Sequence, residues 1–286
     1  MIYRPRPPTK ISPSDMVVFP QCKINLGLYI ERRRPDGYHD IATVMLPVGW
    51  TDVLEVLPGE TDDVRLFCYG RPVDCPPEKN LVVKAYRALA ADLGELPPVD
   101  IHLEKIVPDG AGLGGGSADA AATLMAVNEL FGLGLGKERL AAVAARIGAD
   151  CPLFVYNRPM LATGTGTTLT PIDVDLNSYT LLIAKPRGCA VSTAQAYAGV
   201  HPSGPAPDLN AILGSGIGSW RDTLVNEFEH GVFAAAPRIA EVKAAMYDAG
   251  AVYSAMSGSG AAVFGIFDSR EKAEALSLPD CDVYIQ

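Results

Sequence analysis

Alternation of hydrophobic and polar positions predicts several short β-strands in the first hundred residues. Residues 24–30 are mostly apolar, and residues 53–57 are rich in β-branched side chains. Apolar residues alternate with polar ones at positions 64, 66 and 68, and again at 99, 101 and 103. A period of two residues is typical of a strand with one buried face.

Helical spacing appears next, most clearly between residues 80 and 147. Residues 80–93 carry one apolar stripe, and the segments 117–131 and 137–147 each stop just before a glycine. Downstream we expect strands at 179–184 and 262–267, and a helix that begins at a Ser192 capping box. We also expect a loop over 201–219 and a helical segment over 225–249 that is interrupted at Pro237. A short helix and a final strand should end the chain.

The order of these elements predicts an α+β fold in two halves. Strands and helices interleave without a regular βαβ period, and no G-x-G-x-x-G follows a first strand, so a doubly wound sheet is not favoured. We place the boundary near residue 170, which gives a first domain over 16–170 and a second over 171–286.

The charge balance narrows the class of ligand. The chain has 286 residues, a net charge of −9 and a sequence pI of about 5.0. An acidic chain has no overall field that attracts nucleic acid or an anionic membrane, so we expect neither as a partner. An anionic ligand would have to be bound by local backbone amides and a few basic side chains.

The cysteines and the apolar runs indicate a cytoplasmic protein. No two cysteines form a C-x-x-C pair, and none has histidines at metal-ligand spacing, which favours free thiols in a reducing cytosol. No apolar run approaches the roughly 20 residues that span a bilayer, and the first residues have no secretory signal. The cysteines are Cys22, Cys68, Cys75, Cys151, Cys189 and Cys281.

The glycine-rich segment 108–121 is the strongest chemical signal. It has five glycines within residues 110–116, and it lies between a predicted strand and a predicted Ala-rich helix. Glycine lets successive amides converge on an anion at the helix N-terminus, where Ser117 and Ala118 stand. A flexible linker is the alternative. The segment is not a Walker loop, because no Gly-Lys-Ser/Thr ends it.

The segment resembles the central motif of the GHMP kinases, which include galactokinase, homoserine kinase and mevalonate kinase. Residues 23–26 and 256–264 resemble the N-terminal and C-terminal motifs of the same family. The resemblance implies a ribosomal-protein-S5-like first domain, a ferredoxin-like second domain and an active site between them. It also implies ATP and Mg²⁺ as cofactors, with the triphosphate held by Pro108, Asp109, Gly110, Ala111, Gly112, Leu113, Gly114, Gly115, Gly116, Ser117 and Ala118.

The segment 33–39 resembles a signature of one branch of this family. That branch phosphorylates the C2 hydroxyl of a cytidine-diphosphate-linked methylerythritol, in the non-mevalonate route to isoprenoid precursors, so the resemblance implies this small molecule as substrate. Two alternatives stay open. One is another GHMP kinase, acting on homoserine, mevalonate or a sugar; the other is a nucleotide-binding regulator without catalysis.

The resemblance also implies catalytic roles for Asp150 and Lys23. Asp150 would accept the proton of the substrate hydroxyl, although its place before Cys151-Pro152 also suits a helix N-cap. Lys23 would keep that carboxylate charged and polarise the reacting groups. An unpaired lysine in an apolar strand would be unfavourable, and an exposed charge at the strand end is the alternative.

Four further residues are expected at the substrate. By the family match Tyr38 would stack on cytosine, His39 would hydrogen-bond its edge, and Asn25 would orient the methylerythritol hydroxyls; Tyr197 is a candidate for the opposite stacking face. Structural roles are the alternatives for Tyr38 and His39. No carboxylate cage for a metal is evident, so we expect Mg²⁺ to be held mainly by ATP and water near Ser117.

Residues 1–15 are rich in Pro and Arg and have no hydrophobic period, so we expect a disordered leader. Met16 opens a strand-like run and is the expected natural start. We predict that deletion of residues 2–15 leaves activity and thermal stability unchanged, in a direct comparison with the full chain. Loss of either property would mean that the leader belongs to the folded protein.

Overall fold

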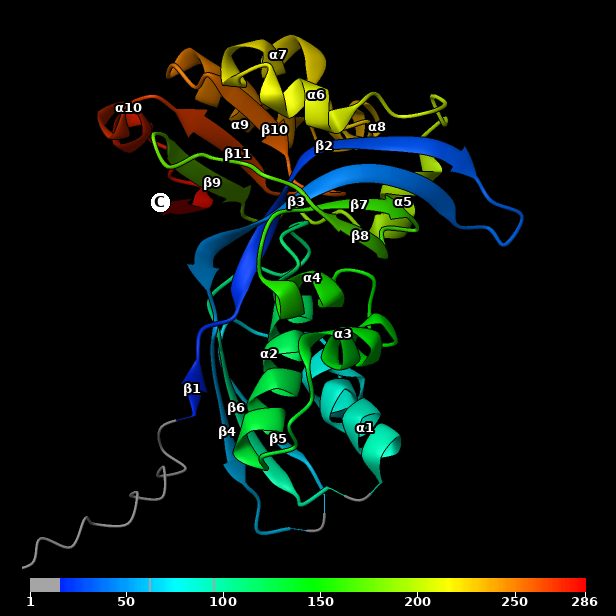
Figure 1. Ribbon diagram of the computed structural model, residues 1–286. Helices are drawn as coiled ribbons and strands as arrows, with labels where there is room; N and C mark the ends of the chain where they lie inside the picture. Colours follow the sequence, from blue (N-terminus) through cyan, green and yellow to red (C-terminus); the bar gives the residue numbers. More distant parts are fainter. Residues whose placement is uncertain (1–15, 62, 95) are drawn as a thin grey trace, which may run out of the picture.

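The chain folds around three four-stranded sheets in a computed structural model that describes residues 16–61, 63–94 and 96–286. The strand orders are β1-β4-β6-β5, β2-β3-β7-β8 and β10-β11-β9-β12. Figure 1 shows the first sheet at one end of the molecule, the third at the other end, and the long strands of the second between them. The middle sheet therefore connects the two ends.

The first sheet has its core on one face. Its strands are β1 (Val17–Val18), β4 (Val53–Pro58), β5 (Arg65–Gly70) and β6 (Val99–Lys105), and the helices beside it are α1 (Leu81–Leu93), α2 (Gly115–Leu130), α3 (Lys137–Ala145) and α4 (Cys151–Tyr156). Alternate residues of β4 and β6 face inward, so that Leu54 and Leu103 are fully buried in one cluster with Leu124 of α2. This packing holds α2 in place, and the first turn of α2 belongs to the glycine segment.

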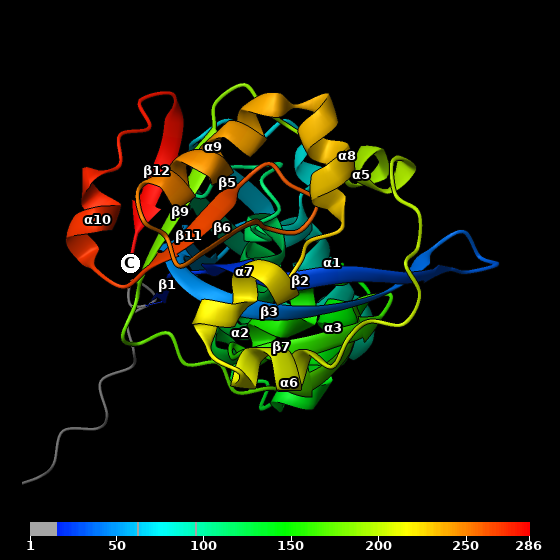
Figure 2. The same ribbon diagram turned by 90° about the horizontal axis from the view of Figure 1, so that it is seen from above.

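The middle sheet is dominated by a long hairpin of β2 (Gln21–Arg33) and β3 (His39–Thr51), which β7 (Met160–Gly164) and β8 (Thr168–Pro171) extend. The tip of the hairpin projects from the body of the molecule (Figure 2). Arg34 bridges Asp36 and Asp40 there, with 3.1 Å between Nη1 and the Asp40 carboxylate. The arginine thus orders the turn that carries Tyr38 and His39.

The third sheet consists of β9 (Thr180–Pro186), β10 (Tyr253–Met256), β11 (Val263–Phe267) and β12 (Cys281–Ile285). Its helices include α8 (Phe228–Ala235), α9 (Pro237–Asp248) and α10 (Arg270–Ala275), and α5 (Thr193–Ala198) packs on α8. The short helices α6 (Leu209–Gly214), η3 (Ile217–Ser219) and α7 (Trp220–Thr223) complete this end, and η2 (Pro77–Lys79) precedes α1. No helix among the described residues is long and apolar enough to cross a membrane.

The α+β class is confirmed, together with most of the predicted elements. The capping box at Ser192 is present, and Pro237 begins a new helix within the segment predicted to be helical. The predicted loop over 201–219 is wrong in part, since α6 lies within it. The leader lies outside the described residues, and the domain boundary near residue 170 stays a prediction.

Strand β3 was missed, for a physical reason. Residues 40–45 of β3 are all buried, so both faces of this stretch contact protein and the sequence shows no alternation. Strands β7, β8 and β10 were missed as well; all four residues of β10 are buried, which removes the same signal. Sheets buried on both faces read as continuous apolar runs, and these are ambiguous without their partners.

The glycine segment is held against a second glycine-rich turn, residues 257–260, and the strand that follows it. The amide of Ala262 donates to the carbonyl of Ala111 over 2.9 Å, and the Ser257 hydroxyl donates to the carbonyl of Gly112 over 2.8 Å. On the other side the amide of Lys23 donates to the Leu113 carbonyl over 2.8 Å. The loop is therefore fixed by segments from both ends of the chain.

We predict that Gly112→Ala destabilises the protein, whereas Gly116→Ala does not. Gly112 has φ +71°, and a Cβ there would lie 2.0 Å from the carbonyl oxygen of Ser257, so the two segments would have to separate. The left-handed conformation alone costs about 1–2 kcal/mol for a residue with a Cβ. Gly116 is helical, and an added Cβ would meet only Leu81 at 3.6 Å.

Thermal unfolding of the two variants beside the wild type checks this. We expect Gly112→Ala to lower Tm by several degrees and Gly116→Ala to leave it within about a degree, because about 1 kcal/mol corresponds to about 2–4 °C in a chain of this size. Equal Tm values for both variants would mean that the close approach is not needed.

Candidate active site

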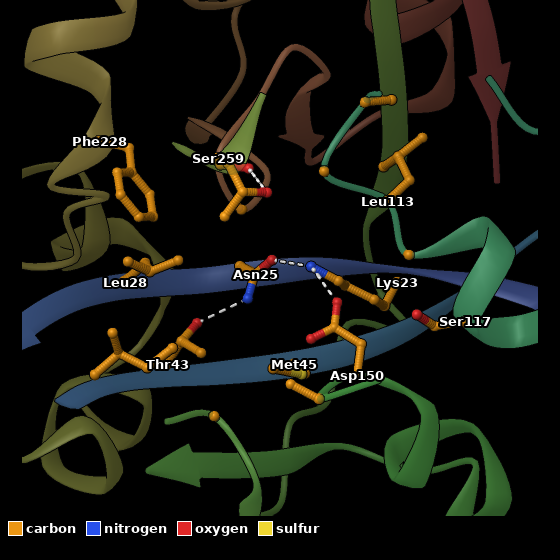
Figure 3. A pocket seen from close by; sticks show the side chains of 18 of the residues that line it. Lys23, Asn25, Leu28, Thr43, Met45, Leu113, Ser117, Asp150, Phe228 and Ser259 are labelled. Atoms are coloured by element: carbon orange, nitrogen blue, oxygen red, sulfur yellow. Dashed lines mark hydrogen bonds and ion pairs between the residues drawn. The ribbon is translucent and has the colours of Figure 1, made fainter. Parts of the chain in front are cut away.

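A cavity of about 780 Å³ lies where the middle sheet, the glycine segment and the third sheet meet. Strands β2 and β3 form its floor, and the first turn of α2 and the turn at Gly258 and Ser259 close two sides (Figure 3). Its size is in the range of sites that bind small molecules. It collects the predicted site residues from distant parts of the sequence, with the exception of Ala118.

Lys23 and Asp150 face each other in this cavity. The Lys23 Nζ lies 3.5 Å from the Asp150 carboxylate, and the side chains are 5% and 31% exposed. Lys23 is therefore buried and paired, and the alternative of an exposed charge at the strand end is wrong. Asp150 is the N-cap residue of α4, as the alternative had it, but its side chain makes no cap bond. The carboxylate is left free to accept a bond from a ligand.

A directed chain of hydrogen bonds orders the lysine. The Lys23 ammonium donates to Asn25 Oδ1 over 2.5 Å, and Asn25 Nδ2 donates to Thr43 Oγ1 over 3.0 Å. The Thr43 hydroxyl then donates to the carbonyl of Gly27 over 2.5 Å. An ammonium can only donate, and the proton of Thr43 is used on Gly27, so Asn25 has to turn its oxygen to Lys23 and its nitrogen to Thr43.

Thr43 is a site residue that the sequence reasoning missed. It is fully buried on β3 and lines the cavity beside Asn25. Because β3 itself gave no periodic signal, nothing in the sequence placed this threonine opposite β2. Its place in the site becomes evident only once β3 is paired with β2.

The first turn of α2 presents backbone donors. Gly114 is the N-cap in a left-handed conformation, and no side chain caps the helix. The amide of Ala118 donates to the Gly114 carbonyl, so only the three amides before it, from Gly115 to Ser117, lie ahead of the helical hydrogen bonds. Ala118 is 2% exposed and does not line the cavity, in contrast to the other residues of the predicted cradle.

Aromatic rings line the far end of the cavity. The rings of His39 and Tyr197 stack with centroids 4.7 Å apart and an angle of 18°, and Tyr197 meets Phe228 edge-on at 4.8 Å. Burial raises the pKa of the Tyr197 phenol. Tyr38 is 69% exposed at the rim. The sequence analysis expects three of these rings at the substrate. It missed Phe228, which lies in the segment predicted only to be helical.

The charged lining is sparse. Lys23 is the only ammonium or guanidinium group that lines the cavity among the described residues, and Asp109 and Asp150 are the carboxylates. No group of three or more His, Cys, Asp or Glu side chains in the described part of the chain could hold a metal ion. An anionic ligand would therefore meet amide dipoles and one ammonium rather than a basic cluster.

Two family models match the sequence. The model for the GHMP kinases N terminal domain covers residues 80–158, and that for the GHMP kinases C terminal covers residues 209–278. The first match contains the glycine segment and Asp150, and the second contains the turn at Gly258.

Curated relatives match nearly the whole chain. A 4-diphosphocytidyl-2-C-methyl-D-erythritol kinase of Parabacteroides distasonis is 46% identical over 267 residues, which is 93% of this chain and 97% of the relative. A protein of the same name from Porphyromonas gingivalis is 44% identical over 268 residues, with the same two coverages.

Solved structures agree. A 4-(cytidine 5'-diphospho)-2C-methyl-D-erythritol kinase has a TM-score of 0.79 and 32% identity, and the match covers 94% of this chain and 97% of that one. A homoserine kinase from Cytophaga hutchinsonii has a TM-score of 0.69 at 20% identity, covering 100% and 96%, and shows the shared fold alone. The two-domain GHMP kinase fold is confirmed, and the chain belongs to the GHMP kinase family, within it to the 4-diphosphocytidyl-2-C-methyl-D-erythritol kinases.

Proposed function

We propose that this enzyme transfers the γ-phosphoryl group of ATP to the C2 hydroxyl of 4-diphosphocytidyl-2-C-methyl-D-erythritol, a step toward isoprenoid precursors. The observation that carries the proposal is the Lys23–Asp150 pair, which faces the free amides of α2 within one cavity. The names of the relatives supply the acceptor. Phosphoryl transfer depends on alignment and charge stabilisation, and these are what the cavity offers.

Asp150 is the group that receives the hydroxyl proton. Its carboxylate is partly exposed to the cavity and has no capping bond that would occupy it. As the new P–O bond forms, the hydroxyl becomes more acidic and its proton passes to the carboxylate. Lys23 stabilises the charged carboxylate before transfer and is held in place by Asn25.

The triphosphate binds at the first turn of α2. The amides from Gly115 to Ser117 point into the region where the helix dipole favours negative charge. Left-handed glycines such as Gly112 and Gly114 let the backbone pass close to Ser257 and Lys23 and so bring the loop up to the ligand.

Mg²⁺ accompanies ATP in this proposal. The residues fit a metal that is bound chiefly through its nucleotide, because the described lining has one ammonium against two carboxylates and no metal cage. The ion neutralises charge on the polyphosphate. Ser117, whose side chain lines the cavity, would be a protein group available to the ion.

The cytidine end of the acceptor binds among the aromatic rings. Tyr38 at the rim supplies a stacking face, and His39, already ordered on Tyr197, presents its ring edge for hydrogen bonds to the base. Asn25 meets the methylerythritol hydroxyls, since it lies beside Lys23 on the cavity floor. The enzyme acts in the cytoplasm, which suits its six free cysteines.

Two other functions are weaker. A homoserine, mevalonate or sugar kinase shares the fold, but the relatives that match most of this chain at 40% identity or more carry another name. A non-catalytic nucleotide-binding regulator has no chemical need for an ordered lysine opposite a free carboxylate.

We predict that Asp150→Asn lowers turnover at least a hundredfold without loss of stability. The amide cannot accept the proton, and general-base groups contribute about 10²–10⁴ in rate. The measurement is ADP release with ATP, Mg²⁺ and 4-diphosphocytidyl-2-C-methyl-D-erythritol, with homoserine, mevalonate and galactose as parallel acceptors. Asp173→Asn, an exposed aspartate outside the cavity, is the matched control.

Unchanged turnover in Asp150→Asn would support the assignment of the substrate but show that Asp150 does not take part in proton transfer. ADP release with another acceptor alone would contradict the assignment of the substrate.

A second prediction concerns the cytidine end. We expect Tyr38→Leu to raise KM for the acceptor about 5- to 150-fold and to leave KM for ATP unchanged, because stacking on one base contributes about 1–3 kcal/mol. Tyr69→Leu removes another exposed tyrosine, on β5 and outside the cavity, and should change neither constant. Equal KM values for Tyr38→Leu and Tyr69→Leu would mean that Tyr38 lies at the rim of the cavity without stacking on the base.

A further inference from the structure

Three charged side chains are buried together beside the glycine segment, outside the cavity. The Lys105 ammonium contacts Asp52 over 2.5 Å and Asp119 over 2.8 Å. The residues Asp52, Lys105 and Asp119 are 0%, 4% and 2% exposed. None of them lines the cavity, so the proposed reaction does not use them directly.

The three residues come from three separate parts of the chain that meet at the glycine segment. Lys105 is the last residue of β6, three positions before the segment begins at Pro108. Asp119 lies on the second turn of α2, near the end of the segment. Asp52 lies between β3 and β4. The cluster, defined here as the buried triad, thus joins the start and the end of the loop to one fixed point.

Asp52 also holds the backbone that leads into the loop. Its Oδ1 accepts from the amide of Ile106 over 2.5 Å and from the amide of Val107 over 2.8 Å. Its Oδ2 accepts from Lys105. One carboxylate therefore binds three consecutive residues, and these bonds fix the path of the backbone that leads into the loop.

Lys105 lies directly under the exit of the loop. A Cβ built on Gly115 would approach the Lys105 Nζ to 3.4 Å. Gly115 is the first residue of α2 and contributes the first of the free amides. The position of that amide is consequently set by the ammonium beneath it and by Asp119 one turn further on.

Stability does not account for the buried triad. Buried ion pairs gain little over well-packed apolar residues, because desolvation offsets their attraction. Asp119 Oδ1 even has no hydrogen-bond partner among the described residues. Burial lowers the pKa of Lys105, but Asp119 and Asp52 outweigh it, so that the pKa is raised and the ammonium stays charged. A buried ionic cluster can instead serve to fix one backbone geometry that apolar contacts would not define.

We propose that the buried triad is a positioning device for ATP, which clamps both ends of the glycine segment so that the amides from Gly115 to Ser117 converge on the phosphates. The inference rests on the proposed function, because it takes the segment as the ATP cradle. Asp119, Lys105 and Asp52 are positioning residues and touch no substrate. Their loss should therefore weaken ATP while the acceptor, bound on β2 and β3, is unaffected.

A matched pair of substitutions at Asp119 tests this. Asn has the size and shape of Asp and keeps an oxygen that accepts from Lys105, whereas Leu branches at the same carbon but is larger and has no polar atom. Burial raises the pKa of Asp119 to about 7 against the pull of Lys105, so the neutral amide is a modest change. We expect Asp119→Leu to weaken binding of a non-hydrolysable ATP analogue at least tenfold, and Asp119→Asn to remain within twofold of wild type.

Calorimetric titration with the analogue and Mg²⁺ gives the affinities, and steady-state kinetics gives KM for each substrate. KM for the acceptor should stay within twofold in both variants, a separation that general destabilisation would not produce. Thermal unfolding establishes that each variant is folded. If Asp119→Leu does not fold, Asp119→Ala takes its place, since alanine also lacks an acceptor for Lys105, fits within the space of the aspartate and leaves Lys105 paired with Asp52.

Three results would contradict the proposal. A folded Leu or Ala variant that binds the analogue as the wild type does would overturn the inference and leave the function intact. Equal losses for ATP and acceptor would assign the buried triad to the fold as a whole. A wild-type chain that does not bind the analogue would overturn the proposed function and this inference together.

Discussion

The contact between the glycine segment and the turn at Ser257 is the constraint on which the rest of the structure depends. Gly112 lies so close to the Ser257 carbonyl that no side chain fits between them. This approach allows the amide of Ala262 to bond to Ala111, and through these bonds the third sheet carries one wall of the cavity. The carbonyl of the next residue, Leu113, accepts from the amide of Lys23. The same contact therefore also fixes the backbone of Lys23 relative to the loop. The backbone thus determines the site before any catalytic side chain is considered.

The turn at Gly258 is in turn held from behind by Asn226. This buried amide donates to the carbonyls of Met256 and Gly258, each over 2.8 Å, and accepts from the amide of Phe228. Residues 225–227 also bond to Leu28 on β2, so the segment joins the hairpin to the turn. A Cβ on Gly258 would lie 3.3 Å from the Lys23 Nζ, which shows how closely this second support surrounds the lysine. Loop, turn and hairpin therefore form one closed set of contacts around the reacting groups.

The sequence predicted the parts of the site that rest on a distinctive local motif. It did not predict residues whose role depends on which strands pair in the fold. Five glycines in seven positions predicted the strand–loop–helix unit, and family resemblance led to Lys23 and Asp150, which the fold brings within 3.5 Å. Thr43 could not be found, because its strand is buried on both faces and gives no alternation. The buried triad was invisible for another reason: Asp52 and Lys105 are 53 positions apart and look like ordinary surface charges until β4 pairs with β6. Local pattern predicts elements and motifs, while long-range pairs appear only with the topology.

The two buried lysines show how an acidic chain can handle a polyanion. With a net charge of −9, the protein cannot attract ATP by its overall field. Lys23 faces the cavity with one carboxylate at 3.5 Å, so part of its charge is available to a ligand. Lys105 faces away and is compensated by two carboxylates, which leaves it no charge to offer and makes it a structural tie. The rest of the attraction comes from amide dipoles, which favour an anion only when they point toward it. Amides that must point at the ligand require a rigid loop. For that reason the charges behind the loop matter as much to binding as the lysine that lines the cavity in front of it.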